Sequence, residues 1–118
     1  MITIYGITNC DTCQKARRWL DARQVDYRFH DLRQDGLTIQ MLERWCARVD
    51  WEKILNKRSL TWRKIPELDR QNLSRNKALA LMLDHPTLIR RPVFDAEKVT
   101  AVGFTDDGYK AILSRLSG

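Results

Sequence analysis

The 118-residue chain has no run of about eighteen apolar residues, so no segment is long enough to span a membrane as a helix. Residues 1–5 lack the basic stretch and the apolar core of an export signal. The three cysteines are too few for the disulfide framework of a secreted protein. We therefore expect a cytoplasmic protein with no membrane partner. In that reducing compartment, two neighbouring cysteines would rest as a dithiol and cycle during work.

A structural zinc site is disfavoured because a second close pair of ligands is missing. Cys10 and Cys13 form one close pair. The remaining candidate ligands, Cys46, His30 and His85, do not form another, whereas structural zinc sites usually contain two. No metal site is therefore predicted. Cys46 lies in an amphipathic segment and is predicted to be a small, buried apolar residue.

The charged residues give no sign of a nucleic-acid interface. The 21 lysines and arginines leave a formal net charge of +6, but they are dispersed, and no basic tail or recognised motif organises them. Most of these lysines and arginines are interpreted as lying on solvated faces of helices, and no direct nucleic-acid binding is expected. Those near the cysteines would serve an anionic substrate or stabilise a thiolate. With 43% hydrophobic and 31% charged residues, the composition is that of a globular protein of one domain.

The most informative feature that is present is the motif Cys10-x-x-Cys13, between a predicted strand and a predicted helix. The strand, 2–6, is β-branched and aromatic, and the helix, 14–22, has apolar residues at helical spacing. Cys10 thus falls where unpaired backbone N–H groups and the positive end of the helix favour an anion. A thiol at this place loses its proton more easily, and the thiolate is the reactive form. We predict a reactive Cys10 and a less reactive Cys13, which lies deeper in the first helical turn.

The rest of the chain carries strand and helix signals without a linker or a repeat. Apolar–polar alternation predicts a strand at 25–31, and Thr38, Ser74 and Thr105 are predicted helix N-caps. The predicted elements that follow are a helix at 39–49, a short helix at 50–55, a helix from 75 to the proline at 86, a hairpin at 91–95 and 99–103, and a helix at 106–116.

This order predicts an α/β protein with a thioredoxin-like (glutaredoxin-like) fold. The single domain, 1–118, would carry a helical insertion at about 38–85 between its βαβ and ββα parts. A right-handed βαβ unit would place the first two strands parallel, with the cysteine-bearing helix on one face. Such folds commonly carry a cis proline before the third strand, facing the cysteines, and Pro92 occupies the matching place. The alternative is an ordinary trans proline at the start of a strand.

Several short segments also match the pattern of a known family, in the same order and over nearly the whole chain. They are residues 3–5, 9–10, 13–17, 57–59, 85–93 and 102–104. On these segments the chain resembles the arsenate reductase (ArsC) family, in the branch that includes Spx and YffB. The segment 85–93 is the most distinctive, because a Cys-x-x-Cys pair alone indicates only a thioredoxin-like protein.

The resemblance implies a role for several residues. In this family one cysteine, at the position of Cys10, attacks the oxyanion, and glutathione or another thiol resolves the adduct. Three arginines hold the anion and lower the pKa of the cysteine; Arg91 matches one of them, and Arg58 lies near the second. The third is absent, because residues 102–104 contain no arginine. This absence, like the additional Cys13, argues against arsenate as the substrate.

Asn9 and Pro92, the neighbours of the cysteine and the arginine, complete the expected site. A guanidinium offers a planar, always-charged fork that suits an oxyanion and also stabilises a neighbouring thiolate. Either role requires Arg91 to reach Cys10, and the alternative is a charge that faces solvent.

Three functions remain open from the sequence. The first is a glutathione-dependent thiol/disulfide reductase, with Cys10 attacking, glutathione as co-substrate and no tightly bound cofactor. The second is an arsenate reductase that uses Cys10 and Arg91. The third is a non-enzymatic, Spx-like regulator that binds RNA polymerase and uses the cysteine pair as a redox sensor.

Overall fold

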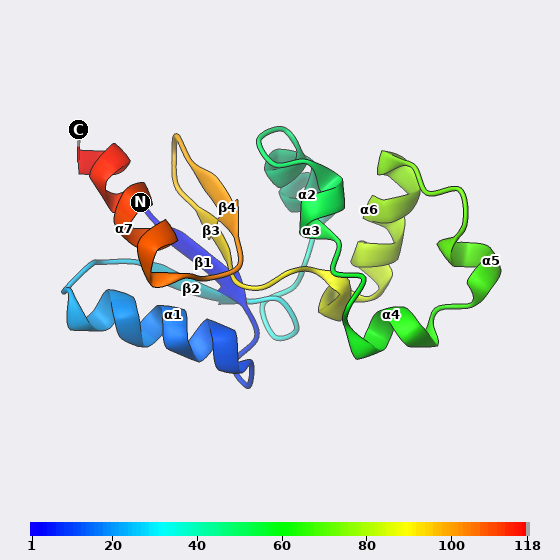
Figure 1. Cartoon of the computed structure of the whole chain (residues 1–118), viewed down its shortest axis with the longest axis horizontal. Coiled ribbons are helices and arrows are strands. Elements are labelled where there is room, and N and C mark those ends of the chain that lie inside the picture. Colours follow the sequence, from blue (N-terminus) through cyan, green and yellow to red (C-terminus); the bar gives the residue numbers. More distant parts are fainter. Residues whose placement is uncertain (118) are drawn as a thin grey trace. The chain divides into compact units, whose positions relative to one another are not determined.

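The structure, a computed structural model, describes residues 1–117 and divides the chain into two compact units. One unit joins Met1–Asp35 to the residues from Arg91 onward, and the other is the intervening segment Gly36–Arg90. Figure 1 follows the chain from blue to red through both units. The inserted unit is longer than the insertion expected at about 38–85. No helix within residues 1–117 is long and apolar enough to cross a membrane.

A four-stranded sheet forms the centre of the first unit, which we call the sheet unit. Its strands lie in the order β2-β1-β3-β4. They are β1 (Thr3–Gly6), β2 (Arg28–Asp31), β3 (Val93–Asp95) and β4 (Thr100–Val102). β1 pairs in parallel with β2 and antiparallel with β3, and β3 pairs antiparallel with β4. The predicted thioredoxin-like arrangement is confirmed, with each strand shorter than its sequence signal.

Two helices, α1 (Asp11–Ala22) and α7 (Asp106–Ser117), pack on one face of this sheet (Figure 1). Ile4 and Phe94 are paired across β1 and β3 and belong to the core on that face. The helices contribute further buried core residues, namely Ala16, Leu20, Tyr109 and Ile112. Burial of apolar area, at roughly 25 cal/mol per Å², holds both helices on the sheet.

The first helix begins at the cysteine motif. Cys10 is its N-cap residue, with extended backbone angles of φ −89° and ψ 122°. Asp11 in the first turn places a negative charge at the positive end of the helix. Residues 11–13 are already helical, so Cys13 lies inside α1 and Cys10 lies at its boundary.

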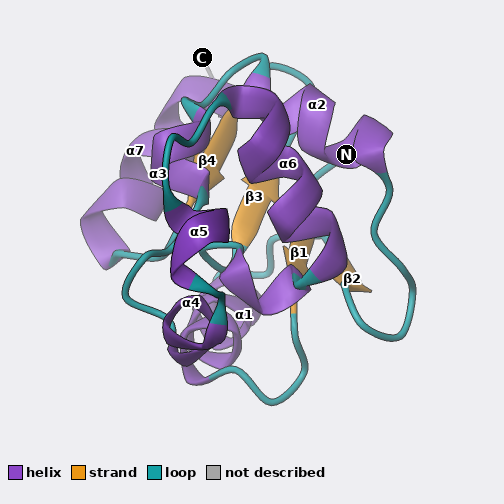
Figure 2. Cartoon of the chain, turned by 90° about the vertical axis from the view of Figure 1, so that its right-hand side faces the viewer, coloured by secondary structure: helices purple, strands orange, loops and turns teal. Residues whose placement is uncertain are grey.

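The inserted unit is built from helices and loops, as the colours of Figure 2 show. Its elements are α2 (Ile39–Cys46), α3 (Trp51–Ile54), α4 (Leu60–Lys64), α5 (Glu67–Arg70), α6 (Arg75–Asp84) and the 3₁₀ turn η1 (Pro86–Leu88). The short helices α4 and α5 have no counterpart among the predicted elements. All three predicted N-caps are confirmed: the hydroxyls of Thr38, Ser74 and Thr105 each accept a hydrogen bond from a backbone N–H three residues on.

The prediction of a buried Cys46 is wrong. Cys46 is the last residue of α2 and is only partly buried. The two residues that follow it, Ala47 and Arg48, are exposed, because the helix ends there and the chain turns away. The amphipathic pattern identified the helix but not the position of its end.

Candidate active site

The thiol of Cys10 lies at the start of α1, directly after the loop that follows β1. The backbone N–H of Cys10 donates to the carbonyl of Ile7 at 3.1 Å, and its carbonyl accepts from the N–H of Gln14 at 2.9 Å. The first bond closes the loop, and the second begins the helix. Cys10 is partly buried, unlike Cys13, which is fully buried.

The surroundings of Cys10 lower the pKa of its thiol. Partial burial by itself would raise this pKa, but hydrogen bonding from the backbone N–H and side chain of Cys13 and from Arg91 outweighs it. The positive charge of Arg91 acts in the same direction. Donors and a nearby cation stabilise the thiolate relative to the thiol. Cys10 is therefore the more nucleophilic of the two cysteines.

The thiol of Cys13 has the opposite character. It is fully buried, and this burial raises its pKa to about 12, with the neighbouring Cys10 opposing a second negative charge. Its sulfur is packed against the end of β1, where a Cβ added to Gly6 would lie 2.6 Å from Cys13 Sγ. Only glycine permits this close approach. Cys13 is therefore a protonated thiol near neutral pH.

Arg91 is the residue directly before a buried proline at the start of β3. The Arg91–Pro92 peptide bond is cis, as the thioredoxin-like fold predicts. The carbonyl of Pro92 accepts a hydrogen bond of 2.9 Å from Gly103 N–H, which fixes the segment before β3 to the end of β4. Because β3 is the neighbour of β1, Arg91 comes close to the loop after β1 and its guanidinium reaches the sulfur of Cys10. The side chain is partly buried rather than fully exposed to solvent.

The other two predicted site residues are both exposed. Asn9 lies in the loop before Cys10, and its side chain has no hydrogen-bond partner among the described residues. Arg58 belongs to the inserted unit, in the turn before α4, where its backbone N–H donates to Asn56 Oδ1 at 3.0 Å. A contact of either residue with a substrate stays a prediction.

The sequence reasoning missed a buried carboxylate beside the cysteine loop. Asp31, at the end of β2, is 4% exposed and accepts four hydrogen bonds, two of them from Thr8 in the loop before Cys10. Burial would raise the pKa of Asp31, but these donors hold it well below its usual range. The one available signal was the position of an aspartate at the end of a predicted strand, which is equally typical of a turn.

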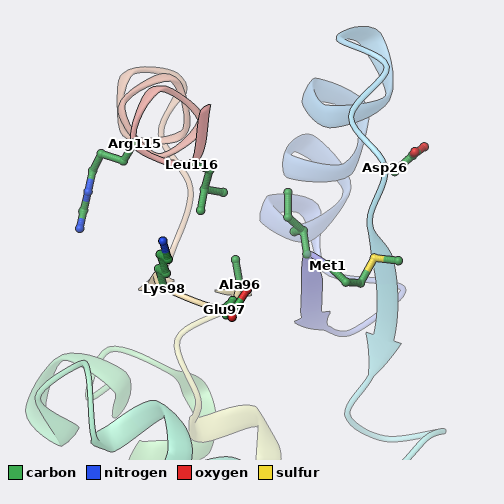
Figure 3. A pocket seen from close by; sticks show the side chains of 8 residues that line it. Met1, Asp26, Ala96, Glu97, Lys98, Arg115 and Leu116 are labelled. Atoms are coloured by element: carbon green, nitrogen blue, oxygen red, sulfur yellow. The ribbon is translucent and has the colours of Figure 1, made fainter. Parts of the chain in front are cut away.

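A cavity of about 570 Å³ lies at the other end of the sheet (Figure 3). Its lining includes Ile2, which precedes β1, and the turn residues 96–98 between β3 and β4. Cys10 instead follows the far end of β1, so this cavity is separate from the thiol site. Among residues 1–117, no group of three or more His, Cys, Asp or Glu side chains is placed to hold a metal ion.

The fold and the site together define a thioredoxin-like protein with a cysteine of lowered pKa at the start of its first helix. The model of the ArsC family matches residues 5–112, and the chain belongs to this family. The solved structure of a protein named YffB is similar, with a TM-score of 0.91 and 43% identity over 94% of this chain and 97% of that one.

Two curated relatives cover the chain to a similar extent. An uncharacterised protein of Haemophilus influenzae is 39% identical over 94% of this chain and 97% of its own length. The global transcriptional regulator Spx 2 of Bacillus anthracis is 30% identical over 98% of this chain and 88% of its own length. The predicted resemblance to the branch that includes Spx and YffB is thus confirmed.

Proposed function

We propose that this protein is a glutathione-dependent thiol/disulfide reductase with Cys10 as the nucleophile. The observation that carries the proposal is the opposite displacement of two thiol pKa values within one motif: the pKa of Cys10 is lowered and that of Cys13 is raised to about 12. One sulfur is ready to attack as a thiolate while its neighbour stays protonated. Arg91 stabilises the Cys10 thiolate both before attack and when it is released again.

The reaction takes two exchange steps. The Cys10 thiolate first attacks the glutathione sulfur of a mixed disulfide between glutathione and the substrate. A Cys10–glutathione disulfide forms, and the substrate leaves as a thiolate that takes up a proton from water. A second glutathione, as its thiolate, then attacks the glutathione sulfur of this adduct. Oxidised glutathione leaves, Cys10 returns as a thiolate, and two electrons have passed from glutathione to the substrate.

In this scheme the chain needs no tightly bound cofactor, because glutathione supplies the electrons. Asn9, directly before Cys10, and Pro92, directly after Arg91, are proposed contacts for the substrate. Cys13 is proposed to be dispensable for turnover, since a thiol with a pKa of about 12 is a poor attacking group near neutral pH.

Cys13→Ser tests the proposed route directly. The variant is expected to keep most of the turnover of a glutathionylated peptide, followed through glutathione reductase and NADPH consumption. If Cys13 resolved the adduct instead, the variant would accumulate a stable Cys10–glutathione disulfide, seen as an added glutathione mass. Arsenate, assayed in parallel, is expected to give little or no turnover. Wild-type protein that turned over arsenate and not the mixed disulfide would replace the proposal with arsenate reduction.

A second candidate function is redox sensing by a regulator that binds RNA polymerase. The similarity to a global transcriptional regulator of Bacillus anthracis over 98% of this chain favours it. The discriminating measurement is binding of purified RNA polymerase to the reduced and the oxidised protein. Tight binding that depends on the state of the cysteine pair, without turnover of the mixed disulfide, would favour the regulator.

A further inference from the structure

The carboxylate of Asp31, beside the thiol site, accepts four hydrogen bonds. Its Oδ2 accepts from the N–H and the hydroxyl of Thr8, at 3.0 Å and 2.7 Å. Its Oδ1 accepts from the backbone N–H groups of Arg33 and Gln34, at 2.8 Å and 3.0 Å. The bonds to Arg33 and Gln34 are local and are those of an ordinary turn. The bonds to Thr8 join residues 23 positions apart and are not needed to form that turn.

The pairing of β1 with β2 places Asp31 beside the loop that carries Cys10. Asp31 lies opposite Gly6 in the parallel pairing of β1 with β2, and the next residue, Leu32, donates its N–H to the Gly6 carbonyl at 2.8 Å. The loop that carries Cys10 starts directly after Gly6. The carboxylate therefore lies beside the first residues of this loop and is 4% exposed.

Thr8 is also bonded on the side of the helix. Its carbonyl accepts from Gln14 Nε2 at 3.1 Å, and Cys10 N–H donates to the carbonyl of Ile7. A shift of Thr8 would therefore move Cys10, two residues later. Asp31 bonds to this loop from β2, whereas Arg91 approaches Cys10 from the side of β3. Strand β1 lies between β2 and β3.

We propose that Asp31 is a positioning residue for the reactive thiol: through Thr8 it holds the loop so that the sulfur of Cys10 stays within reach of Arg91 and of the Cys13 N–H. The proposal rests on the proposed function only in taking Cys10 as the attacking thiol. It predicts that loosening Thr8 changes the reactivity of Cys10.

The test is the pH profile of iodoacetamide alkylation at Cys10, measured by mass spectrometry on full-length protein. Thr8→Val removes the hydroxyl donor and keeps the shape of the side chain, whereas Thr8→Ser keeps the donor. In Thr8→Val the midpoint of the profile is expected to move upward and the rate at pH 6.5 to fall about threefold or more. Thr8→Ser is expected to keep the wild-type profile. A wild-type profile in Thr8→Val would overturn the proposal.

A second pair of variants separates positioning from a general loss of stability. Asp31→Asn is expected to shift the profile in the same direction as Thr8→Val. Asp95, 5% exposed, is the matched control: it accepts from Thr100 Oγ1 at 2.9 Å and pairs with Thr3 at the other end of β1. Asp95→Asn also replaces a buried carboxyl group by an amide and is expected to leave the profile unchanged. An equal shift in both variants would contradict the proposal.

Alkylation needs neither glutathione nor a physiological substrate, so the two proposals fail separately. Wild-type protein without glutathione turnover would refute the reductase and still allow the Thr8 comparison to be made. If Asp31→Asn does not fold, Thr8→Val and Thr8→Ser decide the matter, because Thr8 is exposed and its backbone bond to Asp31 is retained.

Discussion

Two partly buried cysteines, one in each unit of the chain, have thiol pKa values displaced in opposite directions. Burial opposes ionisation of both Cys10 and Cys46. At Cys10, hydrogen bonds from Cys13 and Arg91 overcome that penalty, and the pKa is lowered. At Cys46 the pKa stays raised.

The surroundings of Cys46 explain the difference. Burial raises its pKa, Arg75 lowers it through its charge alone, and the carboxylates of Asp50 and Glu43 raise it again. Each cysteine therefore has an arginine within electrostatic reach, but only Cys10 receives hydrogen bonds. For these two cysteines of similar exposure, the hydrogen-bond donors in contact with the sulfur account for the difference in pKa.

Replacing each cysteine in turn gives the largest expected contrast. Cys10→Ser is expected to lower turnover of the mixed disulfide at least about a thousandfold, because the attacking sulfur is lost. Cys46→Ser is expected to stay within about twofold of wild type, since its thiol remains protonated. The coupled NADPH assay measures both. Substantial activity in Cys10→Ser would remove the basis of every role assigned to this cysteine.

The two arginines offer the next contrast. Arg91→Ala is expected to raise the pKa of Cys10 and to slow its alkylation at pH 7 by about tenfold, the equivalent of one pKa unit or 1.4 kcal/mol. Arg75→Ala is the control and is expected to leave Cys10 unchanged, because Arg75 acts on Cys46. Thermal denaturation should show both variants folded. Unchanged alkylation in Arg91→Ala would make Arg91 an ordinary surface charge.

Gly6→Ala extends the comparison of Cys10 and Cys46 to the third cysteine, Cys13, which is fully buried. The added methyl group would overlap the sulfur of Cys13, and such overpacking typically costs about 1–3 kcal/mol of unfolding free energy. Urea denaturation measures this loss, and labelling of Cys13 in the folded state should become faster. Gly108→Ala is the matched control, because its methyl group would meet Thr105 Oγ1 and not a cysteine. Labelling of Cys13 as slow as in wild type would show that β1 relaxes to accept the methyl group.

The smallest expected effect is the dependence of stability on pH at the cysteine end of the sheet. The pKa of Asp31 is lower in the folded than in the unfolded protein, so its ionised form stabilises the fold above about pH 4, and this contribution is lost as the pH falls further. Asp31→Asn is expected to be less stable at pH 7 and to lose less stability between pH 4 and pH 2.5. The slopes should differ by about 1 kcal/mol per pH unit. Parallel slopes in chemical denaturation at several pH values would contradict this assignment.

Much of the fold was predictable because it depends on interactions between residues that are close in sequence. The strand, the cysteine motif and the helix after it are adjacent in sequence, and the caps at Thr38, Ser74 and Thr105 each depend on a donor three residues away. The cis bond at Pro92 was predictable only through the fold class. The helices α4 and α5, of five and four residues, were missed because they are too short to show a helical period.

The candidate site divides in the same way. The sequence predicts a lowered pKa at Cys10 from its place at a helix start, and it names Arg91 from the family resemblance. It does not reveal the two bonds from Thr8 to Asp31, because they depend on the pairing of β1 with β2. It does not reveal the space that Gly6 leaves for Cys13 either, because that space depends on how α1 packs against the end of β1. The burial of Cys46 was overestimated because an apolar pattern does not specify where a helix ends.

The topology of the sheet also makes the inserted unit an exchangeable module. β2 ends at Asp31 and β3 begins at Val93, at the same end of the sheet, because β1 runs parallel to β2 and antiparallel to β3. With only β1 between them, these two ends lie about 10 Å apart, a gap that about four extended residues can bridge. Strand pairing therefore places no demand on the length of residues 36–90, so evolution or design can enlarge, shorten or exchange this segment while the register beside the cysteines is kept.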